Sequence, residues 1–273
     1  MADRSSDHDS TGTVHVDRDG EVLRLRIDRP RVRNALDQAS LEMMADEVQA
    51  TINDDTTRVI ALTGEGGHFC AGIDLPSVNT KGERRPRTGH VERGIDVGAH
   101  RLVRNLWRSR LPVVAAVQGH AAGLGCQLAL ACDFVLVSPT ARFSEPFVQR
   151  GLSPDSGGTF LLPRLVGLAR AKTMLLLGEV IDGTQAAEWG LVHRLVPDDE
   201  LDAASEELVQ RCAAMPTVAV GLAKDLVHSS LEHTFEQALA DEARTEELPI
   251  RSADFKEGLA AFMDRRDPEF EGR

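Results

Sequence analysis

The pattern of apolar positions changes once along this chain. As far as about residue 195, short apolar runs of strand length alternate with segments in which apolar residues recur every three or four positions. Residues 59–62 and 112–117 are apolar throughout, which is typical of buried strands in a parallel sheet. Beyond Pro197 the spacing is helical only. Four helices are predicted there, at 202–215, 217–230, 234–247 and 252–263.

This change of pattern predicts an α/β fold with a C-terminal helical extension. We place the core of the fold at 13–197 and the helical region at 198–273. Residues 1–12 are rich in Asp, Ser and Gly and are expected to be disordered. Asp19-Gly20 between two alternating segments predicts a β-hairpin. The charge-dense stretch 79–98 is expected to be a mobile surface segment and is a candidate lid.

A glycine-rich turn follows the apolar run at 112–117. Gly119, Gly123 and Gly125 separate this predicted strand from a segment in helical register. Such a turn leaves backbone N–H groups unpaired at a helix N-terminus, where a developing negative oxygen can be held. Taken alone, the turn is more often just a tight join between strand and helix. The glycine-rich strand end at 63–75 is a second place for backbone amides to face a ligand.

A third turn, at 151–159, carries a carboxylate as well as glycines. Its sequence is Gly-Leu-Ser-Pro-Asp-Ser-Gly-Gly-Thr, and an apolar helix follows it. Asp155 is therefore either the N-cap of that helix or a group that moves a proton. From these residues alone, the capping role is favoured.

Charge and cysteine content exclude several classes of function. Forty-three acidic against 31 basic residues give a net charge of -12, which argues against nucleic acid or an anionic membrane as the main partner. The apolar runs are short and the start of the chain is polar, so we expect a cytoplasmic protein without membrane spans. The four cysteines show neither CxxC pairing nor zinc-site spacing, and we expect buried thiols and no metal.

Four motifs, in this order, resemble the crotonase, or enoyl-CoA hydratase/isomerase, superfamily. They are Arg29-Pro30 with Asn34-Ala35-Leu36, Phe69-Cys70-Ala71-Gly72-Ile73-Asp74-Leu75, the run from Gly119 to Asp133, and Pro154-Asp155-Ser156-Gly157-Gly158-Thr159. The resemblance implies a crotonase-like spiral of ββα units with a C-terminal helical region. It also implies an acyl-CoA thioester as ligand and a homotrimer or a dimer of trimers. Coenzyme A is then part of the substrate, and no separate cofactor is expected.

The resemblance further implies which backbone groups bind the thioester oxygen. They are the N–H groups of Ile73 and Leu124, one from each of the first two glycine-rich segments. Two preorganised donors at that oxygen stabilise an enolate. Cys70, Ala71 and Gly123 are expected to line the substrate pocket beside these amides.

The hydratases of this family use two glutamates to position and activate water. The matching positions here hold Gln127 and Phe147. Glutamine exchanges no proton at neutral pH, and phenylalanine neither holds nor activates water. Both residues are expected in the substrate pocket, Phe147 as a wall and Gln127 either as a core amide or as a ligand of substrate or water.

Asp155 matches the aspartate with which dienoyl-CoA isomerases of the family shuttle protons. The surrounding residues 151–164, and Ala187-Glu188-Trp189-Gly190, are also similar to the ring-epoxide isomerases of phenylacetate catabolism. This match reverses the preference for a capping role. The implied function is isomerisation of a double bond or ring in an unsaturated acyl-CoA. An enoyl-CoA hydratase with atypical residues and a non-catalytic acyl-CoA binder are the alternatives.

Four arginines are candidates to bind the coenzyme A nucleotide. Arg31 and Arg33 lie near the first helix, and Arg265 and Arg266 lie near the C-terminus, from where they would reach a neighbouring subunit. Arginine suits phosphate, although exposed arginines are more often merely solvated. The helical region at 198–273 is expected to serve oligomerisation and to complete this site.

Several other polar residues near the motifs have simpler explanations. His68 and His120 flank the glycine turns and are expected to be surface or packing residues. Capping or solvated roles are expected for Asp74 and Glu145. Asp155-Ser156-Gly157-Gly158 also resembles a motif of trypsin-like serine proteases. This likeness is weak, because those enzymes are all-β and no histidine here has the expected context.

Overall fold

A six-stranded sheet forms the centre of the protein. The computed structural model describes residues 13–75 and 87–273, and the prediction for 1–12 lies outside these ranges. The strands follow the order β1-β2-β3-β4-β6-β9. Their bounds are β1 Thr13–Asp19, β2 Val22–Asp28, β3 Val59–Gly64, β4 Val113–Val117, β6 Phe134–Val137 and β9 Arg194–Leu195. β1 and β2 are the predicted antiparallel hairpin, and the other neighbours are parallel.

A smaller sheet of three short strands packs beside the glycine turns. Its order is β5-β7-β8, with β5 at His120–Ala122, β7 at Arg142–Ser144 and β8 at Ile181–Asp182. β5 and β7 are parallel, and β8 is antiparallel to β7. The two strands that matter for the site therefore end side by side, β5 at Ala122 and β7 at Ser144.

Helices pack on the sheets, and their buried apolar side chains complete the hydrophobic core. They are α1 Gln38–Ala50, α3 His90–Ile95, α4 Arg101–Arg108, α5 Leu124–Leu130, α6 Gly158–Leu177 and α7 Gly183–Glu188. α1 begins after Asp37, because the Asp37 carboxylate accepts a hydrogen bond from the Ser40 N–H at 2.9 Å and caps the helix. Its apolar face, which includes Met44 and Val48, is buried against the sheet.

The predicted surface segment at 79–98 is helical in most of its described part, and its residues up to Val97 are largely exposed. Part of it, 79–86, lies outside the described residues, but from His90 the chain is helical, and a π-helical turn at Asp96–His100 joins α3 to α4. Gly98 and Ala99 are buried in that turn. His100 of that turn and residues of α4 form one wall of the pocket described below.

The chain from Asp198 onward contains only helices. They are α8 Leu201–Ala213, α9 Thr217–Ser230, α10 Phe235–Thr245 and α11 Ala253–Asp264, each within two residues of its predicted bounds. α8 packs on the sheet, where Val209 and Cys212 join a cluster with Val59 and Val114. The division between 197 and 198 remains a prediction, since α8 shares the core of the preceding part.

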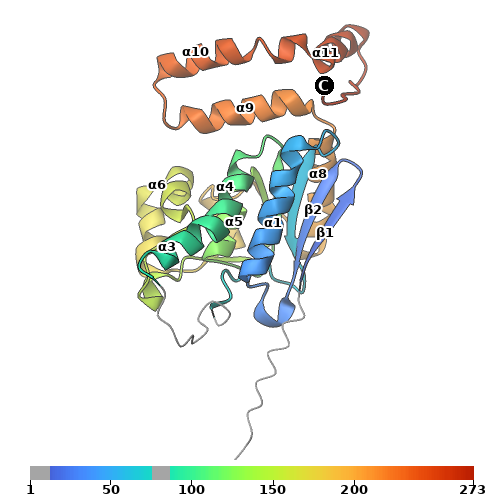
Figure 1. Ribbon diagram of the computed structural model, residues 1–273. Coiled ribbons are helices and arrows are strands. Elements are labelled where there is room, and N and C mark those ends of the chain that lie inside the picture. The colour runs from blue at the N-terminus through green and yellow to red at the C-terminus, as the bar shows by residue number, and fades with distance from the viewer. Residues whose placement is uncertain (1–12, 76–86) are drawn as a thin grey trace, which may run out of the picture.

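α9 is joined to the core by a buried ion pair and a ring stack. The Lys224 ammonium lies 2.6 Å from the Asp133 carboxylate, and the His228 ring stacks on Trp107 of α4 at 3.7 Å. α9, α10 and α11 form a layer at the opposite end of the molecule from the start of α1 (Figure 1). The parallel strands β2, β3 and β4 run away from that layer, so their carboxyl ends, with the glycine turns, lie at the far end.

Candidate active site

Two glycine-rich segments pack so closely that their backbones almost touch. The Cys70 N–H donates to the His120 carbonyl at 2.8 Å, and the Ala122 N–H donates back to the Cys70 carbonyl at 3.0 Å. A side chain on Gly125 would collide with the Cys70 carbonyl. Gly125 is therefore needed for this close approach, because only a residue without Cβ fits there. The packing brings the loop that ends in Ile73 against the first turn of α5.

The segment that leads into Ile73 lies against the start of α5 at this contact. A Cβ on Gly72, which has φ +95°, would lie 3.5 Å from the Leu124 nitrogen. The Ile73 N–H follows directly after Gly72, and Leu124 is the first residue of α5. In these segments the N–H groups of Ala71, Asp74 and Gly123 donate hydrogen bonds to backbone carbonyls. Among the described residues, the Ile73 and Leu124 N–H groups donate no such bond. Two unengaged donors at a helix N-terminus can hold a negative oxygen.

The motif at Arg29 to Leu36 fixes the loop that carries Ile73. The Leu36 N–H donates to the Gly72 carbonyl at 2.8 Å, and the Asp74 N–H donates to the Leu36 carbonyl at 2.9 Å. The buried Arg29 guanidinium lies 3.1 Å from the Asp74 carboxylate. The expected capping or solvated role for Asp74 is therefore wrong, because this carboxylate is half-buried and anchors the loop through Arg29.

The residues predicted to line a substrate pocket beside Leu124 lie around the start of α5, and none of them is in the lining of the pocket described below. Cys70 is fully buried beneath the turn, and Ala71 is half-buried beside Gly72. A Cβ on Gly123 would lie 3.7 Å from the Phe147 ring. Phe147 is thus a wall next to the α5 N-terminus, and it offers no group that handles water.

Gln127 is a buried amide whose partner the sequence did not indicate. Its Nε2 donates to the Glu145 carboxyl at 2.7 Å, and both side chains are completely buried. Burial raises the pKa of Glu145 to about 8, while hydrogen bonds with Cys126 and Gln127 lower it and the charge of Asp155 raises it. The capping or solvated role expected for Glu145 is wrong. Phe143 in β7, Glu145 and Phe147 stand two residues apart, so an extended chain places all three on one face. This spacing was the signal for the burial of Glu145.

Asp155 lies on the turn between a short helix at Val148–Arg150 and α6. The N-cap of α6 is Gly157, which has φ +93°, and no side chain caps this helix. The capping role for Asp155 is therefore excluded. Its side chain is half-buried, and its charge acts on Glu145. The Asp155 carbonyl accepts a hydrogen bond from the Gly158 N–H at 3.3 Å, which closes the turn.

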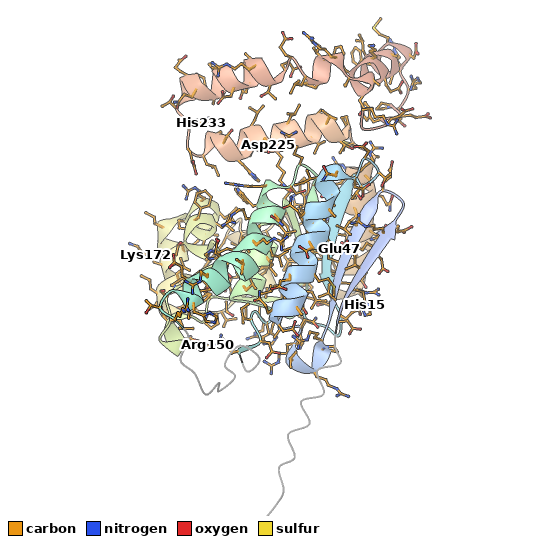
Figure 2. All side chains as sticks on the ribbon, viewed as in Figure 1. His15, Glu47, Arg150, Lys172, Asp225 and His233 are labelled. Atoms are coloured by element: carbon orange, nitrogen blue, oxygen red, sulfur yellow. The ribbon has the colours of Figure 1, made fainter. Side chains whose placement is uncertain are left out.

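Ser156 adopts a left-handed conformation with φ 53° and is nearly fully buried. Its N–H donates to Nε2 of His100 at 3.2 Å, so the turn is tied to the helical segment before α4. A left-handed conformation is costly for serine and persists only where the surroundings enforce it. Arg150, on the approach to this turn, lies at the opposite end of the molecule from Asp225 and His233 (Figure 2).

A pocket of about 220 Å³ opens beside the Asp155 turn. Its lining is His100, Val103, Arg104, Trp107, Ser156, Gly157, Phe160 and Leu161. The sequence did not single out the residues from the helical segment. His100, Val103 and Trp107 are spaced three and four apart, which is the signal of one helix face.

The four arginine candidates for binding coenzyme A form two pairs, and within one chain these pairs lie at opposite ends of the molecule. Arg31 and Arg33 are exposed near the site, where the Arg33 carbonyl accepts from the Ala71 N–H at 2.9 Å. Arg265 and Arg266 end α11, in the layer at the other end of the molecule (Figure 1). Arg266 also forms a two-pronged ion pair with Glu257.

The two histidines near the turns contact each other. The His68 and His120 Nδ1 atoms lie 3.2 Å apart, and both rings are half-buried. Burial lowers the pKa of His120, and the nearby His68, Arg33 and Arg142 lower it further. This contact agrees with the packing role expected for them.

Other features of the described residues add no further chemistry. They contain no group of three or more His, Cys, Asp or Glu side chains that would hold a metal ion. All four cysteines are buried and free. None of the helices resolved in the described ranges has the length and apolarity that a membrane crossing requires.

Comparison with known proteins identifies the family. Residues 17–273 match the family Enoyl-CoA hydratase/isomerase. The chain is 37% identical over 254 residues to the 1,2-epoxyphenylacetyl-CoA isomerase of Escherichia coli K12, covering 92% of this chain and 95% of the relative. It is 34% identical over 258 residues to the 2,3-dehydroadipyl-CoA hydratase of the same organism, covering 94% and 98%.

The structure gives the same result. It superposes on the enoyl-CoA hydratase of Bacillus anthracis with a TM-score of 0.88 and 31% sequence identity, over 96% of this chain and all of the other. The chain has the α/β crotonase fold with C-terminal helices and belongs to the enoyl-CoA hydratase/isomerase family.

Proposed function

We propose that this protein is an isomerase that shifts a double bond or rearranges a ring in an unsaturated acyl-CoA thioester. One observation carries the proposal: Asp155 is a half-buried carboxylate without a capping role, close enough to the buried Glu145 for its charge to act on that carboxyl group. The positions that match the glutamates of hydratases hold Gln127 and Phe147. The 37% identity to an enzyme named as 1,2-epoxyphenylacetyl-CoA isomerase supports the same reaction class.

In the proposed mechanism, the thioester carbonyl oxygen accepts hydrogen bonds from the N–H groups of Ile73 and Leu124. This polarisation acidifies the carbon conjugated with the thioester, and the Asp155 carboxylate removes a proton from it. The electron pair of the broken C–H bond moves into an enolate, whose oxygen the two amides stabilise. Asp155 then returns the proton to a different carbon, so that no atom is gained or lost.

The acyl group would occupy the pocket of about 220 Å³ next to Asp155. Val103, Trp107, Phe160 and Leu161 give it largely apolar walls, which suit a hydrocarbon or aromatic group. Phe147 would close the side next to Gly123 and keep water from the enolate.

The coenzyme A moiety would be bound by Arg31 and Arg33 of the same chain. Arg265 and Arg266 would reach it only from a neighbouring subunit, since α11 lies at the other end of the molecule (Figure 1). Exposed apolar side chains in the C-terminal layer, including Phe235, Phe262 and Met263, fit an interface between subunits. We expect light scattering of the full chain to give three or six times the mass of one chain, and a monomer would contradict this arrangement.

Hydration of an enoyl-CoA is the second candidate. Glu145 is a carboxyl group close to Gln127, and a relative 34% identical is named as a hydratase. Glu145 is completely buried and hydrogen-bonded to Gln127, so no face of its carboxyl group is open to a water molecule, and this favours the isomerase.

A substrate panel decides between the candidates. The full chain is assayed with crotonyl-CoA, a 3-enoyl-CoA, a 3,5-dienoyl-CoA and a ring-epoxide thioester. We expect isomerisation of at least one of the last three, with a kcat/KM about 100-fold or more above that for crotonyl-CoA hydration, the size of one proton-transfer contribution. Brisk hydration of crotonyl-CoA without isomerisation would favour the hydratase, and tight binding of all four without turnover would leave an acyl-CoA binder.

A further inference from the structure

Glu145 lies next to both parts of the proposed site, the start of α5 with Leu124 and the turn that carries Asp155. It follows directly after β7, and the carbonyl of its neighbour Ser144 accepts from the Gly123 N–H at 2.9 Å, at the start of α5. From α5 itself, Gln127 donates to the Glu145 carboxyl at 2.7 Å, and the Cys126 thiol lies beside the same carboxyl group. Glu145 is therefore fixed to the helix whose first N–H is the proposed oxyanion donor.

The start of α6 rests on this pair. A Cβ on Gly158 would lie 2.9 Å from the Gln127 Nε2 and 3.6 Å from the Glu145 Oε1, so glycine alone fits without displacing them. The Gly158 N–H in turn donates to the carbonyl of Asp155. The Gln127–Glu145 pair thus packs against the start of α6, one turn along α5 from Leu124.

The pair is also the place where hydrogen bonding is incomplete. Three buried side-chain polar atoms in the described ranges make no hydrogen bond: Gln127 Oε1, Glu145 Oε1 and Ser156 Oγ. Buried polar atoms are nearly always paired, and an unpaired ionised oxygen costs far more than an unpaired neutral one. A carboxyl group with one unpaired, fully buried oxygen, and no basic side chain paired with it among the described residues, is favoured in its neutral form.

We propose that Glu145 is a positioning residue held as a neutral carboxylic acid: with Gln127 it fixes the Asp155 turn against α5, and its neutrality keeps a second negative charge away from the enolate. This inference rests on the proposed function, because it assigns Asp155 as the proton carrier. Glu145 itself transfers no proton to the substrate.

Ionisation of Glu145 then opposes the reaction. A buried carboxylate here would repel both the Asp155 carboxylate and the enolate oxygen, and it would disturb the Gln127 contact. The groups that face it are Cys126 on α5 and Asp155 before α6, with His100 bonded to the same turn through Ser156. The pKa of Glu145 is raised to about 8, so the active, neutral form predominates below pH 8 and is lost as the pH rises through it.

The test compares wild type, Glu145→Gln and Glu145→Leu over pH 6 to 10, with the isomerase substrate found in the panel. For a group of pKa about 8, the neutral fraction falls about tenfold between pH 7 and pH 9, and we expect the wild-type kcat/KM to fall equally. Glu145→Gln is always neutral, and its rate at pH 9 should stay within about twofold of its rate at pH 7. Glu145→Leu is neutral but cannot bond Gln127, and its kcat should be low at every pH while KM changes little.

The exposed Glu179→Gln is the matched control and should keep the wild-type profile. The proposal is overturned if Glu145→Gln retains the alkaline fall, or if Glu145→Leu behaves like Glu145→Gln at all pH values.

A second measurement does not need turnover. Infrared difference spectra should contain a band of a protonated carboxylic acid that is lost between pH 7 and 9 and is missing in Glu145→Gln. An ionised Glu145 at pH 7 overturns the proposal whatever the activity. If no panel substrate is isomerised, the proposed function fails, and this titration still decides whether Glu145 is neutral.

Discussion

Replacement of Asp155 by Asn should lower kcat/KM for isomerisation by about 100-fold to 10,000-fold, the range for loss of a general acid–base group. Asparagine keeps the shape of the side chain but carries no proton at neutral pH. KM should change little, because in the proposed mechanism the Ile73 and Leu124 amides bind the thioester oxygen and the apolar pocket binds the acyl group. The measurement is steady-state kinetics on the isomerase substrate from the panel.

Hydrogen exchange gives an independent readout of the same step. In deuterated water, wild type should exchange the proton on the carbon conjugated with the thioester, and Asp155→Asn should not. Asp225→Asn is the control, since Asp225 is on α9, far from Arg150 and the site (Figure 2), and is about half exposed. If Asp155→Asn exchanges and isomerises at the wild-type rate, another group carries the proton and the mechanism is wrong.

Much of the fold could be predicted because its signals are local. The helices from Leu201 onward repeat apolar residues at three and four spacing, and Thr234 with Gln237 forms a capping box that starts α10. The buried strands β3 and β4 are apolar throughout. β8 and β9 were missed, since each is two residues long and exists only through pairing with a distant strand.

The site divides in the same way. Ile73 and Leu124 could be nominated from motifs because Gly72 and Gly125 mark where the backbones approach closely. Their role at the thioester oxygen remains a proposal. Glu145 could not be nominated, because its neutrality depends on burial against α5 and α6, which are formed by other parts of the chain. The pocket lined by His100, Val103 and Trp107 could not be predicted either, because it forms only where their helix packs beside the Asp155 turn.

Replacement of Gly72 by Ala should lower kcat/KM by about 100-fold to 1,000-fold, the cost of losing one oxyanion donor. Gly72 has φ +95°, and a Cβ there would lie 2.6 Å from the Ala122 carbonyl oxygen and 3.5 Å from the Leu124 nitrogen. The Ile73 loop and the α5 N-terminus must therefore separate, and their two N–H groups no longer converge on one oxygen. Stopped-flow or steady-state assays of the isomerase substrate measure the loss.

Gly67→Ala separates this effect from simple backbone strain. Gly67 also has a positive φ, +79°, and lies in the same segment, but a Cβ there meets nothing within 4 Å. Both variants pay the cost of a left-handed alanine, about 1 to 2 kcal/mol, and both should lose some thermal stability. Only Gly72→Ala should lose the enolate-stabilising geometry. Equal and small losses of kcat/KM in the two variants would mean that the Ile73 and Leu124 amides do not act together on the thioester oxygen.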